Sequence, residues 1–231
     1  MSRTPRPKAL EASYSGRIFR SRLEARWAIL LDLLEINWDY EPSHYQVGPE
    51  LYYLPDFYLP QHRLWLEVKG EAFLDAGSMA KCLAAVAGPT PIPLREAPYT
   101  ASDRLLLAGS LQSADSGRPL HTLITDAGER RAHLGYATVG PEGVVPLGRP
   151  WSTMEASGVK MSRRPAAALR TKLLSPHPVV GSVPADVAAA YRAAASARFD
   201  DSRATLAASN NPALLARLAL RRAGRPLGRI D

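Results

Sequence analysis

A chain of 231 residues with 46% apolar residues is long enough for one hydrophobic core, or for a core with a smaller appended domain. It contains no run of eighteen apolar residues and its first residues lack the apolar stretch of a secretory signal, so we expect neither a membrane span nor export. The single cysteine, Cys82, excludes an internal disulfide framework and a thiolate zinc cluster. A reducing, cytoplasmic setting is therefore expected, in which Cys82 packs rather than reacts.

The formal charge of +7 is distributed unevenly along the chain. Residues 1–26 carry a net charge of +5, residues 27–90 carry −6, and residues 91–231 carry +8. An acidic block between basic flanks suits a cation-binding site within a surface that attracts a polyanion such as nucleic acid. An arginine-rich coding bias explains the same charge, because arginine outnumbers lysine twenty-four to five, and this alternative stays open.

The first predicted element is a helix over residues 21–35, after a proline-rich basic segment at residues 1–12 that we expect to form a flexible arm. Ser21 is a suitable N-cap, and Glu24 has the spacing of a capping box with it. The helix is indicated by apolar residues at steps of three and four, which are Leu23, Trp27, Leu30, Leu31 and Leu34.

After residue 37 the pattern changes to short strands separated by turn residues. The order helix, three strands, helix, strand predicts an α/β fold with a mixed sheet whose faces are covered by helices. The predicted strands and helix after residue 37 cover residues 37–41, 52–58, 63–68, the helix 77–87 and the strand 91–94, with a turn at residues 60–62.

The signal weakens beyond residue 95. We expect strands at residues 121–125 and 132–139, little periodicity from 140 to 183, a helix at 184–199 and a strongly basic helix at 212–223. The predicted organisation is accordingly the arm at 1–12, a core at 13–100, a strand and loop extension at 101–175, and a helical basic region at 176–231.

Charged side chains within the predicted strands are the candidate site. Glu67 and Lys69 point to the same face of one strand, and Asp56 can reach the same end of the sheet if the preceding strand pairs with it. Two carboxylates beside a backbone carbonyl form an oxygen-only site that magnesium or manganese prefers. Glu24 lies at the edge of the helical stripe and adds a third acid.

Structural explanations exist for each of these residues. Glu67 and Lys69 can form an ordinary ion pair on a strand face, which contributes little to stability. Asp56 follows Pro55 and suits a turn at a strand edge, and Glu24 is accounted for by the capping box. The four residues together need several independent coincidences to be explained in this way.

The residues resemble the PD-(D/E)XK nuclease superfamily, because Pro55-Asp56, ten intervening residues and Glu67-Val68-Lys69 match its signature in order, spacing and strand context. The segment from Arg20 to Ala25 resembles the upstream helix that supplies a further glutamate in TnsA-like transposon-end endonucleases and phage junction-resolving enzymes. The resemblance covers residues 14–96. It implies a restriction-endonuclease-like αβββαβ core with a mixed sheet, followed here by a C-terminal extension of short strands and helices.

The resemblance also implies an activity. A nuclease of this kind would be a magnesium- or manganese-dependent endodeoxyribonuclease that hydrolyses DNA phosphodiester bonds with a metal-activated water, in the cytoplasm of a bacterium or encoded by a phage or mobile element. It implies that Asp56, Glu67 and the Val68 backbone carbonyl bind the metal. Lys69 would help to activate the water, and Glu24 would have a supporting role among the catalytic and metal-binding residues.

Two groups of arginines are candidates for contacting DNA. Arg17, Arg20, Arg22 and Arg26 surround the start of the first predicted helix, where phosphate is attracted by guanidinium groups and by the helix N-terminus. Arg217 and Arg221 share one face of the predicted C-terminal helix, although a solvated basic tail would have the same composition. The chain has no recognisable base-reading motif, so we expect a homodimer or a targeting protein partner.

Three alternatives remain open at this stage. A non-catalytic nucleic-acid-binding or assembly protein that keeps the nuclease fold would have the same sequence pattern over residues 14–96. RNA could be the substrate of the same hydrolysis reaction in place of DNA. Restriction, repair, junction resolution, transposition and phage replication all use such sites, and chemistry does not choose among them.

Overall fold

The computed structural model describes residues 9–111, 114, 117–157, 181–200, 203–205, 216 and 219. These residues belong to two compact units, the first within Met1–Ile36, Leu111–Arg118 and Val180–Asp231, and the second within Asn37–Ser110 and Pro119–Val179. This grouping differs from the four consecutive segments expected from the sequence, because elements near the two ends of the chain pack with each other. Among the described residues, no helix combines the length and the apolar character needed to cross a membrane.

The first unit contains a small sheet built from both ends of the chain. Strands β1 (Ala12–Tyr14) and β2 (Arg17–Phe19) form a hairpin whose two turn residues, Ser15 and Gly16, have φ of 51° and 76°. Two positive φ values are the signature of the type I′ turn, whose twist matches that of the flanking strands. Strand β13 (Arg203–Thr205) pairs with β1 in parallel and with β12 (Arg198–Asp200) in antiparallel orientation, which gives the order β12-β13-β1-β2.

Two helices complete the first unit. Helix α1 (Arg22–Leu33) confirms the predicted helix, and its apolar stripe is buried except for the partly buried Leu23. Helix α4 (Ala185–Ala195) packs against α1 and ends four residues before the predicted end, since β12 follows it. The predicted helix at 212–223 lies outside the described residues, except for helical positions at Ala216 and Ala219.

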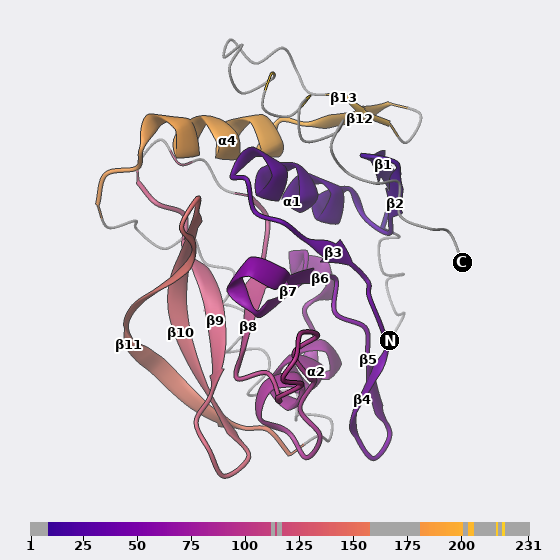
Figure 1. The fold of residues 1–231 in the computed structure, drawn as a ribbon, viewed down its shortest axis with the longest axis vertical. Helices are drawn as coiled ribbons and strands as arrows, with labels where there is room; N and C mark the ends of the chain where they lie inside the picture. Colours follow the sequence, from indigo (N-terminus) through magenta and orange to yellow (C-terminus); the bar gives the residue numbers. More distant parts are fainter. Residues whose placement is uncertain are drawn as a thin grey trace, which may run out of the picture. The chain divides into compact units, whose positions relative to one another are not determined.

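The second unit is α/β, with a seven-stranded mixed sheet in the order β11-β10-β9-β8-β7-β6-β3. Figure 1 shows β9, β10 and β11 side by side as its longest strands. The described strands of this sheet are β3 (Asp39–Tyr40), β6 (Phe57–Leu59), β7 (Leu64–Val68), β8 (Arg104–Ala108), β9 (His121–Asp126), β10 (Arg131–Gly140) and β11 (Gly143–Glu155).

A crossover helix connects two parallel strands of the large sheet next to the candidate site. Strands β3, β6 and β7 are successively antiparallel, whereas β7 and β8 are parallel and are joined through α2 (Ala76–Ala87). Asp75 begins α2, because its carboxylate accepts a hydrogen bond of 2.8 Å from the Ser78 N–H. Two short 3₁₀ turns, Pro60–His62 and Glu71–Phe73, flank β7.

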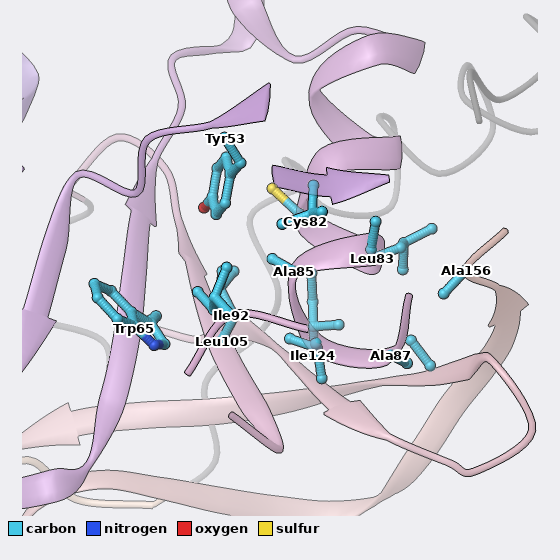
Figure 2. Packing of buried hydrophobic residues seen from close by; sticks show 14 of the residues in the cluster. Tyr53, Trp65, Cys82, Leu83, Ala85, Ala87, Ile92, Leu105, Ile124 and Ala156 are labelled. Carbon is cyan, nitrogen blue, oxygen red and sulfur yellow. The ribbon is translucent and has the colours of Figure 1, made fainter. Parts of the chain in front are cut away.

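Helix α2 lies between two layers of the second unit. It contacts β8, β9 and β10 of the large sheet and also the separate hairpin of β4 (Tyr45–Gly48) and β5 (Leu51–Tyr53). The buried cluster between them is shown in Figure 2. Its members come from the sheet, the helix and the hairpin and include Tyr53, Trp65, Leu83, Leu105 and Ile124.

Two strand predictions differ from the structure, and the longest described strand was not predicted. The segment 52–58 is divided between β5 and β6, because Pro55 lies between them and cannot donate a hydrogen bond to a neighbouring strand. Residues 91–94 contribute only an isolated bridge from Pro93 to Ala101, and β8 is the strand that follows the crossover. Strand β11 was not predicted at all; it is the edge strand, where Pro146 and Pro150 are tolerated.

Candidate active site

The pairing of β6 with β7 brings the candidate acids together. Phe57 pairs with Leu66, Tyr58 with Trp65 and Leu59 with Leu64, so the next residues, Asp56 and Glu67, lie opposite each other. Asp56 is 1% exposed and Glu67 is 2% exposed. The structure therefore places two carboxylates from neighbouring strands in one buried position, as the sequence predicted.

Asp56 is held by its backbone and by its side chain. Its carbonyl oxygen accepts a hydrogen bond of 2.9 Å from the Glu41 N–H, directly after β3. Its Oδ2 accepts a hydrogen bond of 2.7 Å from the backbone N–H of Val68. The first bond fixes the backbone of Asp56, and the second is a charge-assisted bond that limits the rotation of its carboxylate.

Glu67 is held through both carboxylate oxygens. Its Oε2 accepts a hydrogen bond of 2.7 Å from the Tyr53 hydroxyl, and its Oε1 forms an ion pair with the Lys69 ammonium group. Lys69 lies two residues beyond Glu67, so both side chains point to the same face. The side chain of Lys69 is 23% exposed, which leaves its ammonium group as the more accessible member of the pair.

The charged groups of the site shift the pKa values of neighbouring side chains. Burial alone would lower the pKa of Lys69, but the carboxylates of Glu67 and Asp56 outweigh it and raise that pKa above its ordinary value. Burial, together with the negative charge of Glu67, raises the pKa of Tyr53 well above its usual range. At neutral pH, therefore, Lys69 is a cation and Tyr53 is a neutral hydrogen-bond donor.

The Val68 backbone supplies a further oxygen atom. The Lys69 N–H donates to the Ala108 carbonyl on β8, at 2.8 Å, whereas the Val68 N–H donates to Asp56 on the opposite side of β7. The N–H and C=O of one strand residue point to the same neighbour, so the Val68 carbonyl also faces the Asp56 side. The donor set is Asp56, Glu67 and this carbonyl, all oxygen, which fits magnesium or manganese.

Asp56 and Glu67 are not joined by a third metal-binding side chain among the described residues. Among the described residues, no group of three or more histidine, cysteine, aspartate or glutamate side chains is placed to hold a metal. Magnesium is commonly bound by one or two carboxylates while water and substrate phosphate complete its coordination. Asp56 and Glu67 match that smaller protein contribution.

Glu24 has the local environment of the capping box. Its N–H donates to the Ser21 Oγ at 3.1 Å, and the Ser21 hydroxyl donates to the Glu24 Oε1 at 2.7 Å. Glu24 is buried and belongs to the first unit, whereas the other predicted catalytic residues belong to the second. Its predicted supporting role stays a prediction.

The arginines proposed for DNA contact fall into three groups. Arg22 donates to the Phe199 carbonyl at 3.3 Å, and Arg26 donates twice to the Ala197 carbonyl just beyond the C-terminus of α4, at 3.3 and 3.2 Å. Both side chains therefore link α1 to the segment that follows α4, and their contact with DNA stays a prediction. Arg17 in β2 and Arg20 before α1 stay predicted phosphate contacts, and Arg217 and Arg221 lie outside the described residues.

Two residues that contact this site were not expected from the sequence. Tyr53 reaches Glu67 from the β4–β5 hairpin, and Cys82 of α2 belongs to the same buried cluster as Tyr53. Figure 2 shows the Tyr53 ring and the Cys82 sulfur at one end of the buried cluster. Burial, together with the charge of Glu67, raises the pKa of Cys82, so this thiol stays protonated and packs as predicted. Residues 51–53 are Leu-Tyr-Tyr, so the sequence does not distinguish the buried Tyr53 from the exposed Tyr52.

Comparisons of the chain with models of protein families, with curated proteins and with solved structures gave no match.

Proposed function

We propose that the protein is a metal-dependent endonuclease that hydrolyses phosphodiester bonds of DNA. The observation that carries the proposal is the β6–β7 pairing, which sets Asp56 opposite Glu67 and puts Lys69 on the Glu67 carboxylate. A carboxylate pair with an adjacent ammonium group matches the needs of phosphodiester hydrolysis, in which a bound cation and a positive side chain counter the charge of the transition state.

The arrangement of the elements supports a restriction-endonuclease-like core. Along the chain, α1, β3, β6, β7, α2 and β8 follow the order helix, three strands, helix, strand. The first three strands are antiparallel neighbours, and the last is parallel to the third. The β4–β5 hairpin is an insertion into this order, between the first and second strands of the core.

Asp56, Glu67 and the Val68 carbonyl would hold magnesium or manganese. When bound there, the metal supplies a lowered pKa for a coordinated water and a positive charge beside the scissile phosphate. The Val68 N–H fixes the Asp56 carboxylate so that Oδ1 is directed away from that hydrogen bond. The Tyr53 hydroxyl and the Lys69 ammonium group fix the two oxygens of Glu67.

Lys69 acts in this proposal as a cation rather than as a base. Its pKa is raised by the two carboxylates, so the ammonium group keeps its proton at the pH where nucleases work. A protonated lysine donates hydrogen bonds and stabilises negative charge on a phosphate oxygen, and it orients the attacking water by donation. Proton abstraction by Lys69 is inconsistent with this ion pair.

Cleavage assays with matched variants test the proposal. The purified protein is incubated with supercoiled, linear and branched DNA and with matched RNA duplexes, in the presence of Mg²⁺ or Mn²⁺. We expect DNA cleavage that depends on the metal and is lost in Asp56→Asn and Glu67→Gln. Glu71→Gln is the control, because Glu71 is an exposed acid four residues from Glu67.

The possible results separate the competing functions. Cleavage that is absent in the parent protein, or unchanged in Asp56→Asn and Glu67→Gln, refutes the proposal. Nucleic-acid binding without calorimetric uptake of Mn²⁺ would instead identify a non-catalytic binding or assembly protein. Cleavage of the RNA duplex but not of DNA would support metal-dependent phosphodiester hydrolysis and would identify RNA as the substrate.

A further inference from the structure

Tyr53 reaches the candidate site from outside the main sheet. It is the last residue of β5, in the two-stranded β4–β5 hairpin that packs on α2. Its side chain is 3% exposed, whereas that of its neighbour Tyr52 is 60% exposed, because successive side chains of a strand point to opposite faces. The hairpin thus presents one tyrosine to the site and one to solvent.

The Tyr53 hydroxyl completes the support of the Glu67 carboxylate. Its hydrogen bond to Oε2 is 2.7 Å long and buried, while Lys69 occupies Oε1. Two different partners on the two oxygens define the rotation of the carboxylate plane, which the strand backbone alone leaves loose, since the terminal torsion of glutamate is broad. Lys69 is a flexible side chain from the same strand, whereas Tyr53 is a rigid ring anchored elsewhere.

The ring of Tyr53 is itself fixed by packing. It belongs to the buried cluster that contains Trp65 from β7 and Cys82 and Leu83 from α2, and Figure 2 shows it among these side chains. A phenol has two side-chain torsions, and burial in a packed cluster leaves it little freedom. The position of the hydroxyl is therefore determined by the hairpin and by the side chains of α2 and β7 that pack around the ring.

We propose that Tyr53 is a positioning residue that holds the Glu67 carboxylate in its metal-binding orientation, so that the β4–β5 hairpin is part of the catalytic apparatus. This inference rests on the proposed function. Partners that orient a metal-binding carboxylate without touching the metal contribute about 10- to 100-fold to metal affinity or activity. Tyr53 touches neither metal nor substrate in this role and acts only through Glu67.

The test measures metal affinity and turnover in a pair of single-atom variants. Tyr53→Phe removes only the hydroxyl, and Tyr52→Phe removes the equivalent atom from the exposed neighbour. We expect Tyr53→Phe to weaken Mn²⁺ binding in calorimetry by about tenfold and to lower kcat at fixed Mn²⁺, with an unchanged KM for DNA. Tyr52→Phe should match the parent protein in all three quantities.

Two further measurements separate positioning from folding. In a Glu67→Gln background, Tyr53→Phe should have no additional effect on Mn²⁺ binding, because its partner carboxylate is gone. Thermal unfolding without metal shows whether Tyr53→Phe is folded, and Tyr53→Met provides a second variant without a donor that should reproduce the loss of affinity.

Each result either supports the inference or overturns it. Equal Mn²⁺ affinity and kcat in folded Tyr53→Phe and in the parent protein overturn the positioning role and leave the proposed nuclease intact. A loss of affinity that persists in full in the Glu67→Gln background also overturns it, because Tyr53 would then act elsewhere. A parent protein that neither binds Mn²⁺ nor cleaves DNA refutes the proposed function itself, and the inference with it.

Discussion

His121 makes the stability of the protein depend on pH between about 4 and 6.5. It lies at the start of β9, is 7% exposed, and has a pKa lowered from 6.5 to about 4 by burial. The folded state thus keeps the imidazole neutral, while the unfolded chain binds a proton at mildly acidic pH. Stability from this residue is complete above pH 6.5 and decreases as the pH falls toward 4.

The size of the effect follows from the shift of the pKa. A difference of this size corresponds to a total loss of about 3 kcal/mol once the pH lies below both pKa values. At pH 5 the unfolded state is already protonated and the folded state is still largely neutral, which gives a loss of about 2 kcal/mol relative to pH 7. That is a large share of a typical domain stability of about 5–15 kcal/mol.

Urea unfolding at pH 7 and pH 5 measures this loss in the parent protein, in His121→Leu and in the control His44→Leu. His44 is exposed and lies in the same unit. We expect the difference between the two pH values to shrink by about 2 kcal/mol in His121→Leu and to be unchanged in His44→Leu. Equal pH dependence in His121→Leu and the parent protein, or an imidazole NMR signal of His121 that titrates near 6.5, would refute the reasoning.

Three further predictions concern the site and the two units. Lys69→Met should lower the rate of DNA cleavage by about a hundredfold while Mn²⁺ binding becomes tighter, because a cation beside the two carboxylates is removed; calorimetry that shows weaker binding would contradict this. Ser21→Ala removes the N-cap of α1 and should reduce the free energy of unfolding by about 1 kcal/mol in denaturant titrations, and an unchanged value would show that the cap is replaced. Leu105→Ala in the core of the second unit should cost about 2–5 kcal/mol, whereas Leu10→Ala at an exposed position should change stability by less than about 0.5 kcal/mol. Similar midpoints of denaturant unfolding for these two variants would contradict the assignment of Leu105 to the hydrophobic core.

Local patterns in the sequence predict several of the helices and strands. Helix α1, strand β7 and helix α2 all carry their signal within a dozen residues, as an apolar period with a capping or turn residue at the end. Strands β8 and β11 are harder to predict, since β8 pairs with β7 across the crossover through α2 and β11 pairs with β10 at the edge of the sheet. A leucine run such as that of β8 fits a buried strand or a helix, and the prolines of β11 are acceptable only because it is an edge strand.

Contacts between side chains are less predictable than elements. The sequence of β5 does not separate Tyr53 from Tyr52, and only the packing of the hairpin on α2 brings the Tyr53 hydroxyl to Glu67. The arginines of α1 illustrate the same point. Their composition is typical of a phosphate-binding surface, yet Arg22 and Arg26 donate to carbonyl groups near the end of α4, more than 170 positions away in sequence. Composition does not reveal which acceptor a guanidinium group finds.

The spacing of Asp56 and Glu67 has a geometric origin. Ten residues separate them: three in β6, four in the connection that contains the turn Pro60–His62, and three in β7. Arg63 closes this connection in the left-handed region, with φ of 47°, and Leu59 pairs directly with Leu64. Because the strands are antiparallel, equal lengths on both sides of the connection place the flanking residues opposite each other. The spacing between the proline-aspartate pair and the glutamate in the sequence therefore reflects the register of the β6–β7 hairpin. A shift of that register by one residue would turn Glu67 to the opposite face of the sheet.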